Sequence, residues 1–157
     1  MKELPGSVKH LTVWLLIGTA IFLAMQAWQA QQRRSLFQHS GGVIELRRAA
    51  DGHFHWPGQL NGVAVEFLVD TGATRTALPQ ALARRAGLVS EGSTRSNTAG
   101  GIAEGYAARA DVVLQGGVSV KQLPVTVLPD LGAPLLGMDL LSKMRFSQSG
   151  GVLRFEP

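Results

Sequence analysis

Three consecutive residues with catalytic potential, Asp70, Thr71 and Gly72, stand directly after the apolar run at residues 67–69. A carboxylate at the end of a buried strand is a candidate for acid–base catalysis, because burial and a like-charged neighbour change how such a group binds its proton. Glycine permits a tight turn, so Gly72 can bring its own N–H toward the carboxylate. Thr71 adds a short, stiff side chain that donates and accepts hydrogen bonds. The triplet therefore predicts a catalytic carboxylate held by its own loop.

A predicted hairpin positions this triplet. Asn61 and Gly62 separate two apolar runs, and both residue types tolerate the positive φ of a two-residue hairpin turn. In the second run, residues 63–69, apolar side chains alternate with the others, as in a strand that buries one face. We therefore expect Asp70 on a loop that a rigid sheet holds in place.

The rest of the body consists of short apolar segments separated by turn residues. Strands are expected at residues 43–46, 53–56, 59–60, 106–114, 118–120, 123–128 and 152–155. Short helices are expected at residues 79–86, between a proline and a glycine, and at residues 138–144. This pattern predicts an all-β fold, a closed barrel with one or two short helices. The glycine-rich tip at residues 98–103 fits either an ordinary surface hairpin or a mobile lid.

A separate segment precedes this body. Residues 11–28 carry no charge, and as a helix they reach about 27 Å, just enough for the hydrocarbon core of a bilayer. Trp14 and Trp28 lie near the two ends, where interfacial aromatic residues are favoured. The segment predicts an N-terminal transmembrane helix. A cleaved signal peptide, with small residues at 24–30, and a buried soluble helix are the alternatives.

The predicted organisation has four parts. Residues 1–10 form an N-terminal tail, residues 11–28 the transmembrane anchor, residues 29–42 a polar tether and residues 43–157 the folded domain. Basic residues flank the anchor on both sides almost equally, so the charge rule for orientation gives little direction. The short tail resembles that of a signal-anchor, and we expect the N-terminus in the cytoplasm.

Composition excludes several classes of function. The chain of 157 residues has no cysteine, which excludes disulfides and thiol catalysis. From residue 35 onward there are 11 basic and 10 acidic residues, so the body is nearly neutral and gives no case for nucleic-acid binding. His53 and His55 share a face of a predicted strand, but no third ligand is spaced to join them. We expect no metal site.

The order of these motifs resembles that of a known family. Asp-Thr-Gly-Ala-Thr at residues 70–74, a glycine-tipped hairpin, Leu-Leu-Gly at residues 135–137 with a short helix, and a C-terminal strand follow one another. Together they resemble retropepsin-like (clan AA) aspartic proteases, and most of all the membrane-anchored, single-domain bacterial type. The resemblance covers residues 43–157.

The resemblance implies an aspartic endopeptidase that hydrolyses peptide bonds with a water activated between two Asp70 carboxyls of a homodimer. Thr71 would hydrogen-bond across the two-fold axis, and the Gly72 N–H would hold the carboxylate. The expected substrate-binding residues on the loop and its lid are Ala73, Thr74, Leu78, Ala99, Gly100, Gly101 and Ile102. The substrate would be a protein or peptide, with no cofactor. The resemblance also implies a single-pass protein of the bacterial inner membrane with a periplasmic protease domain.

The dimer also follows from chemistry. One carboxyl cannot act as both base and acid on one water, whereas two that share a proton can. This chain has one Asp-Thr-Gly and is too short for two lobes, so the second Asp70 must come from another copy. Asp139 could be mistaken for that second acid. It lacks a following Thr-Gly and begins a predicted helix, so we interpret it as structural.

Two other functions stay open at this point. One is a catalytically inactive, membrane-anchored module of the same fold that binds peptides or dimerises. The other is an anchored barrel with a structural role and a chance motif. The intact triplet at Asp70 favours the protease, because a module that only binds has no need of the carboxylate.

Overall fold

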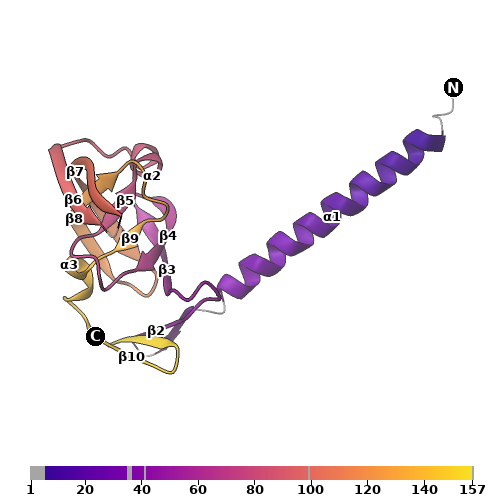
Figure 1. Ribbon diagram of the computed structural model, residues 1–157. Helices are drawn as coiled ribbons and strands as arrows, with labels where there is room; N and C mark the ends of the chain where they lie inside the picture. Colours follow the sequence, from indigo (N-terminus) through magenta and orange to yellow (C-terminus); the bar gives the residue numbers. More distant parts are fainter. Residues whose placement is uncertain (1–5, 35–36, 41, 99, 157) are drawn as a thin grey trace. The chain divides into compact units, whose positions relative to one another are not determined.

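The computed structural model describes residues 6–34, 37–40, 42–98 and 100–156. The chain divides into two compact units, Met1–Ser35 and Leu36–Pro157 (Figure 1). The second unit contains all the strands and the two short helices, so it holds the folded domain.

The first unit is the helix α1, Gly6–Arg34. It contains no proline and is rich in leucine, alanine and glutamine, which favour a long uninterrupted helix. Among the described residues, no helix combines the length and the apolar character that crossing a membrane requires. Within the segment predicted as a polar tether, residues 29–42, α1 continues to Arg34 and the strand β1, Phe37–Ser40, joins a sheet.

A ring of strands forms the body of the second unit. The strands are β3 (His55–Leu60), β4 (Val63–Val69), β5 (Ala77–Pro79), β7 (Gly101–Leu114), β8 (Ser119–Leu128) and β9 (Leu135–Leu136). They pair in the order β3, β4, β9, β5, β8 and β7, and pairing of β3 with β7 closes the ring. The predicted closed all-β barrel is confirmed.

The hairpin of β3 and β4 has the predicted turn. Asn61 and Gly62 have φ angles of 47° and 80°, and Leu60 pairs with Val63 across the turn. The Asn61 side chain adds two long-range bonds, since its Nδ2 donates to the Ala86 carbonyl and its Oδ1 accepts from the Asp111 N–H. This turn therefore fixes both the hairpin register and the neighbouring loops.

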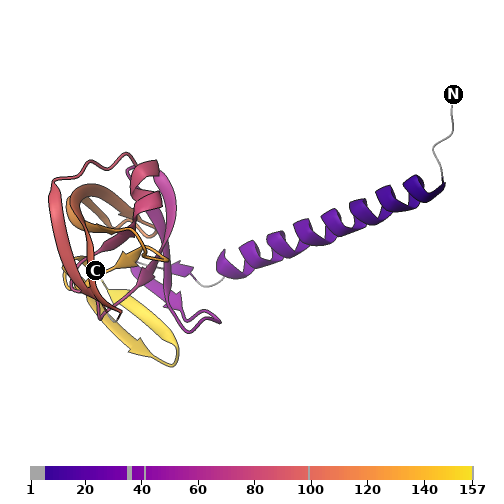
Figure 2. The same ribbon diagram turned by 45° about the horizontal axis from the view of Figure 1, so that its top comes forward.

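A second sheet joins both ends of the domain. It runs β1, β2 (Val43–Arg47), β11 (Val152–Glu156) and β10 (Arg145–Ser149), and Figure 2 shows the C-terminal hairpin in yellow. The ring centroids of Trp56 and Phe155 lie 4.4 Å apart, so β11 packs on the barrel. Trp56 also donates from Nε1 to the Gln115 carbonyl at 2.8 Å. Burial of large aromatic side chains stabilises this contact between barrel and sheet.

Several elements differ in length from the prediction. The helices α2 (Gln80–Arg85) and α3 (Met138–Leu141) are shorter than expected, while β8 is one strand where two were expected. Gln122 bridges those two segments with a φ of 53°, beside an irregularity in the pairing of β7 and β8. The strand β6 (Gly92–Thr98) is the first strand of the predicted glycine-tipped hairpin, and it lies in a polar segment. The strand β10 was not predicted, because its segment shows no apolar alternation.

We expect the Gly62→Ala substitution to lower the free energy of unfolding by about 1 kcal/mol, because an alanine is strained at positive φ. No atom lies within 4 Å of the position that a Cβ would take, so a steric clash does not contribute. The measurement is chemical denaturation of the full chain. Gly132→Ala is the control, since Gly132 also has open space but no left-handed φ. Equal losses in both variants would contradict the assigned turn.

Candidate active site

Backbone pairing fixes Asp70 at the end of β4. The Asp70 N–H donates to the Leu136 carbonyl at 3.0 Å, and the preceding N–H of Val69 donates to Phe54 at 2.9 Å. The strand β9 runs parallel to β4 and places Leu136 opposite Val69. Asp70 is half-buried. The carboxylate therefore projects from a backbone that is held on both sides.

The loop after Asp70 holds its carboxylate. The Gly72 N–H donates to Asp70 Oδ1 at 2.8 Å, and the Ala73 N–H donates to the Asp70 carbonyl at 3.2 Å. A Cβ at Gly72 would lie 3.2 Å from Oδ1, closer than most side chains tolerate. The predicted contact between the Gly72 N–H and the carboxylate is confirmed. Thr71 is exposed at the tip of this loop.

Asp139 locks the segment that follows the loop. Its carboxylate accepts from the Thr76 N–H at 3.0 Å and from Thr76 Oγ1 at 2.9 Å, and Thr76 is fully buried. Thr76 Oγ1 also accepts from the Gly137 N–H at 3.2 Å. Asp139 lies in the first turn of α3, as predicted. Both carboxylate oxygens are engaged by Thr76, which supports the structural interpretation of Asp139.

A close approach of two backbones completes this arrangement. A Cβ at Gly137 would lie only 2.5 Å from the carbonyl carbon of Arg75. The Ala73 carbonyl accepts from the Met138 N–H at 2.8 Å, and the Thr74 carbonyl accepts from the Asp139 N–H at 3.1 Å. Only glycine fits at this position, because any side chain would push the loop away from α3.

A cleft of about 810 Å³ opens beside Asp70. The Asp70 loop and the strand β6 both contribute to its lining. The lining residues are Asp70, Gly72, Ala73, Thr74, Arg75, Ala77, Thr94, Arg95, Ser96, Asn97, Thr98, Thr126, Leu128, Leu131 and Leu135. The volume lies in the range of ligand sites, and apolar side chains alternate there with hydroxyl and charged groups.

The predicted lid is a hairpin of β6 and the first half of β7. The two strands pair from Gly92 opposite Ala107 to Thr98 opposite Gly101. Thr98 Oγ1 donates to the Gly101 carbonyl at 2.8 Å and closes the tip. Ile102 is 70% exposed at this tip. We call residues 92–107 the flap hairpin.

The cleft contains some of the predicted substrate-binding residues and not others. Ala73 and Thr74 line it, whereas Gly100, Gly101 and Ile102 do not, and Ala99 lies outside the described residues.

Leu78 requires a correction. It is fully buried in the hydrophobic core and does not line the cleft. Successive residues of a strand face opposite sides, so Ala77 faces the cleft and Leu78 faces the core.

The sequence interpretation missed other lining residues. Arg75 could have been predicted from the sequence, since this residue continues the loop that begins at Asp70. Leu128 and Leu135 gave no local signal. Their place in the cleft depends on the parallel pairing of β5 with β8 and on the insertion of β9, both of which join segments far apart in the chain.

The predicted histidine pair lies elsewhere, at the start of β3. His55 Nε2 lies 2.7 Å from Asp51 Oδ2, and the His53 N–H donates to Asp51 Oδ1 at 3.0 Å. These hydrogen bonds, the backbone bond first, lower the pKa of Asp51. Across the described part of the chain, no group of three or more histidine and acidic side chains has the geometry of a metal site.

We expect the Asp139→Ala substitution to destabilise the domain by about 1–3 kcal/mol, because the buried N–H and hydroxyl of Thr76 lose their acceptor. Asp139→Asn, which keeps one acceptor oxygen, should cost less. Denaturant titration of each variant measures this difference. The control is Asp130→Asn, an exposed acid outside the cleft, for which no change is expected. A loss no larger for Asp139→Ala than for this control would contradict the assigned role.

Solved structures resemble this chain. A retropepsin-like aspartic protease from Rickettsia conorii matches with a TM-score of 0.58 and 28% identity, covering 76% of this chain and 93% of that one. The EIAV protease complexed with the inhibitor HBY-793 matches with a TM-score of 0.51 and 21% identity, covering 60% of this chain and 89% of that one. The second likeness concerns the fold alone. No curated protein matches the sequence.

The family comparison places the Asp70 loop, the whole flap hairpin and α3 within one match. The family model described as "gag-polyprotein putative aspartyl protease" matches residues 56–143, which is more than half of the chain. By its sequence and its retropepsin-like fold, the chain belongs to this family of aspartyl proteases.

Proposed function

We propose that the protein is an endopeptidase that hydrolyses peptide bonds with a water held between the Asp70 carboxyls of two identical chains. One observation carries the proposal. The carboxylate of Asp70 is held by the Gly72 N–H at 2.8 Å, and it lies at the wall of a cleft of about 810 Å³. A fixed carboxylate beside a cleft is the arrangement that acid–base hydrolysis requires.

The second copy follows from the number of carboxylates. Among the described residues that line the cleft, Asp70 is the only acid. Two carboxyls close together share one proton, so one can act as base while the other acts as acid. Thr71 is exposed on the same loop, where a two-fold axis would let it hydrogen-bond with Thr71 of the second copy.

The reaction then proceeds by proton transfer. The ionised Asp70 takes a proton from the water, whose oxygen attacks the carbonyl carbon of the peptide bond. The protonated Asp70 of the second copy donates a hydrogen bond to the carbonyl oxygen and stabilises the negative charge that forms there. A proton then passes from the carboxyl pair to the amide nitrogen, the C–N bond breaks, and one shared proton remains.

The flap hairpin would bind the peptide as an added strand. An extended peptide pairs its backbone with a sheet edge, while alternate side chains enter pockets. The residues of β6 that line the cleft, from Thr94 to Thr98, carry mostly hydroxyl and amide groups that suit backbone recognition. We infer that peptides bind between β6 and the Asp70 loop.

We further propose that residues 11–28 anchor the protein in the bacterial inner membrane, with the protease domain in the periplasm. Large apolar side chains of α1, from Val13 to Met25, are exposed on the helix surface. Exposed apolar side chains in this number need cover from lipid or protein. Two anchored copies would also meet at a higher effective concentration.

We expect the Asp70→Asn substitution to lower kcat/KM for peptide cleavage by at least roughly 10²–10⁴-fold, because the amide cannot accept the proton of the water. The fold should persist, since the amide oxygen still accepts from the Gly72 N–H. Cleavage is measured by mass spectrometry, and folding by circular dichroism. Cleavage by the variant at the wild-type rate would exclude Asp70 as the base. Cleavage by the wild-type chain would exclude the alternative that the protein is a catalytically inactive binding module.

When the wild-type chain is co-expressed with an equal amount of the Asp70→Asn variant, we expect the activity per total amount of both chains to be about a quarter of the wild-type value. The reason is that only homodimers of intact chains hold both carboxyls. Co-expression with Asp130→Asn is the matched control and should cause no loss. Residual activity of one half would show that each chain acts alone.

We expect the full chain to stay with membranes after alkaline extraction and the Ile17→Arg variant to be released in part, since a charge near the centre of a spanning helix costs about 2.5–3.5 kcal/mol. Ile17→Val is the control. A reporter active only in the periplasm, fused to the C-terminus, tests orientation. Recovery of the unaltered chain in the soluble fraction would exclude the anchor.

A further inference from the structure

Apart from Asp70, the charged side chains that line the cleft are positive. Of its lining residues, Asp70, Arg75 and Arg95 carry charge. A shared carboxyl pair in the proposed dimer would contribute one negative charge, while each copy would contribute two arginines. A peptide that enters the cleft therefore meets an excess of positive charge close to the scissile bond.

Arg75 has no acidic partner within the described residues. No salt bridge or hydrogen bond of its side chain is found in that part of the structure. Asp139, which binds the neighbouring residue, directs both carboxylate oxygens to Thr76. The guanidinium of Arg75 is exposed and keeps its donors for another group.

The backbone of Arg75 is fixed relative to the catalytic carboxylate. Gly137 packs directly against the Arg75 carbonyl, and the neighbours Thr74 and Thr76 both bond to Asp139. Arg75 therefore extends from a rigid segment five residues after Asp70, and little backbone entropy is lost when it binds a ligand.

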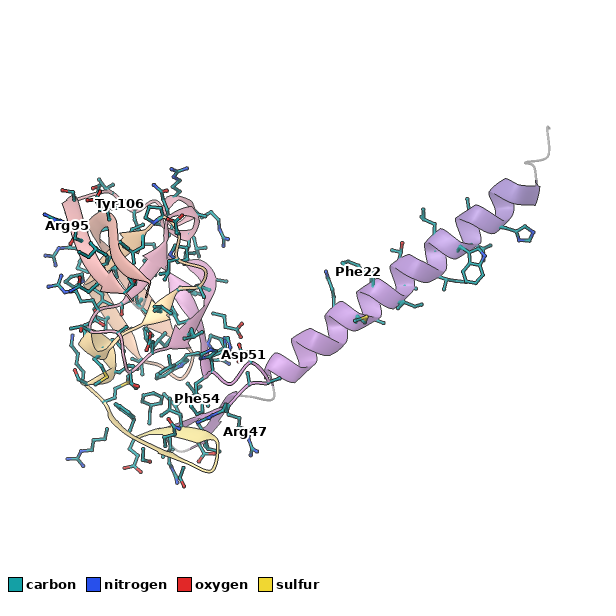
Figure 3. The ribbon with its side chains drawn as sticks, viewed as in Figure 1. Phe22, Arg47, Asp51, Phe54, Arg95 and Tyr106 are labelled. Atoms are coloured by element: carbon teal, nitrogen blue, oxygen red, sulfur yellow. The ribbon has the colours of Figure 1, made fainter. Side chains whose placement is uncertain are left out.

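Arg95 is the weaker candidate of the two. It lies on the flap hairpin, where Figure 3 labels it near Tyr106, and the strand register places it opposite Glu104. Opposite charges that face each other across two strands balance each other in part. The unbalanced charge of the cleft is therefore that of Arg75.

We propose that Arg75 selects substrates with a glutamate or aspartate side chain close to the scissile bond. The proposal rests on the proposed function, since it concerns the peptide that the same cleft would hold. Arginine binds a carboxylate with two parallel hydrogen bonds, which gives direction as well as charge. The two copies each supply one Arg75, so acidic side chains on both sides of the scissile bond are favoured.

Peptides that differ only by glutamate or glutamine beside the cleavage site test the proposal. We expect fluorescence anisotropy to show roughly tenfold tighter binding of the glutamate peptide than of the glutamine peptide to the Asp70→Asn chain. A gain of this size lies between that of an exposed ion pair and that of a buried charged hydrogen bond. The difference should shrink as salt is raised, because the contact is exposed to solvent.

The double variant Asp70→Asn, Arg75→Gln should bind the two peptides about equally. Arg84→Gln in place of Arg75→Gln is the matched control, because Arg84 is an exposed arginine of α2 outside the cleft, and it should keep the preference. Circular dichroism confirms that each variant is folded. Equal binding of both peptides to the Asp70→Asn chain, or a preference that survives Arg75→Gln, would overturn the proposal.

Cleavage by the unaltered chain tests the proposed function separately. Faster cleavage of the glutamate peptide supports both ideas. Cleavage of both peptides at equal rates overturns the specificity of Arg75 and leaves the protease intact. A binding preference for glutamate without any cleavage supports Arg75 as the selecting residue and counts against the endopeptidase.

Discussion

The contact between Gly137 and the backbone at Arg75 and Thr76 is the constraint on which the site depends. It lets β9 enter between β4 and β5, so that the Leu136 carbonyl can accept from the Asp70 N–H. Asp139 also accepts hydrogen bonds from Thr76. A side chain at residue 137 would separate these backbones, and the hydrogen bonds that join Ala73 and Thr74 to α3 would lengthen. The position of the carboxylate thus depends on a residue that never touches it.

The second constraint is chemical. A protein chain that holds one fixed carboxylate has half of the acid–base pair that peptide hydrolysis by carboxyl groups requires. The loop around Asp70 leaves Thr71 exposed, and among the described residues the Gly72 N–H is the one hydrogen-bond donor to the carboxylate. A second carboxyl could therefore approach without displacing an internal partner. In the proposed dimer, the two-fold axis would supply the second carboxyl.

Local signals explain which features the sequence predicted. The Asn61 and Gly62 turn, the apolar alternation of β4 and the helix start at Asp139 each depend on residues that are neighbours in the chain. The closed all-β barrel was predicted from the spacing of the short apolar segments and the turn residues between them.

Features that depend on distant segments were missed or corrected. Leu78 was expected in the cleft, but the face it presents is set by pairing of β5 with β8, which no local pattern records. The strand β10 lies at the edge of its sheet with every residue exposed, so it lacks the apolar alternation that marks a strand. Thr126 and Leu135 reach the cleft through the same long-range pairings.

In the proposed peptide complex, the flap hairpin and the Asp70 loop would contact the substrate in different ways. A Cβ at Gly105 would lie 2.0 Å from the Val127 carbonyl, so the base of the hairpin is pressed against the barrel wall. The strand β6 then meets the cleft with polar side chains such as Thr94 and Ser96, which can bond any peptide backbone and distinguish few side chains. In that complex, selection by side chain would come from the Asp70 loop. On this loop and the strand β5 that follows it, the lining residues Ala73 and Ala77 have small side chains, whereas Arg75 has a long, charged side chain.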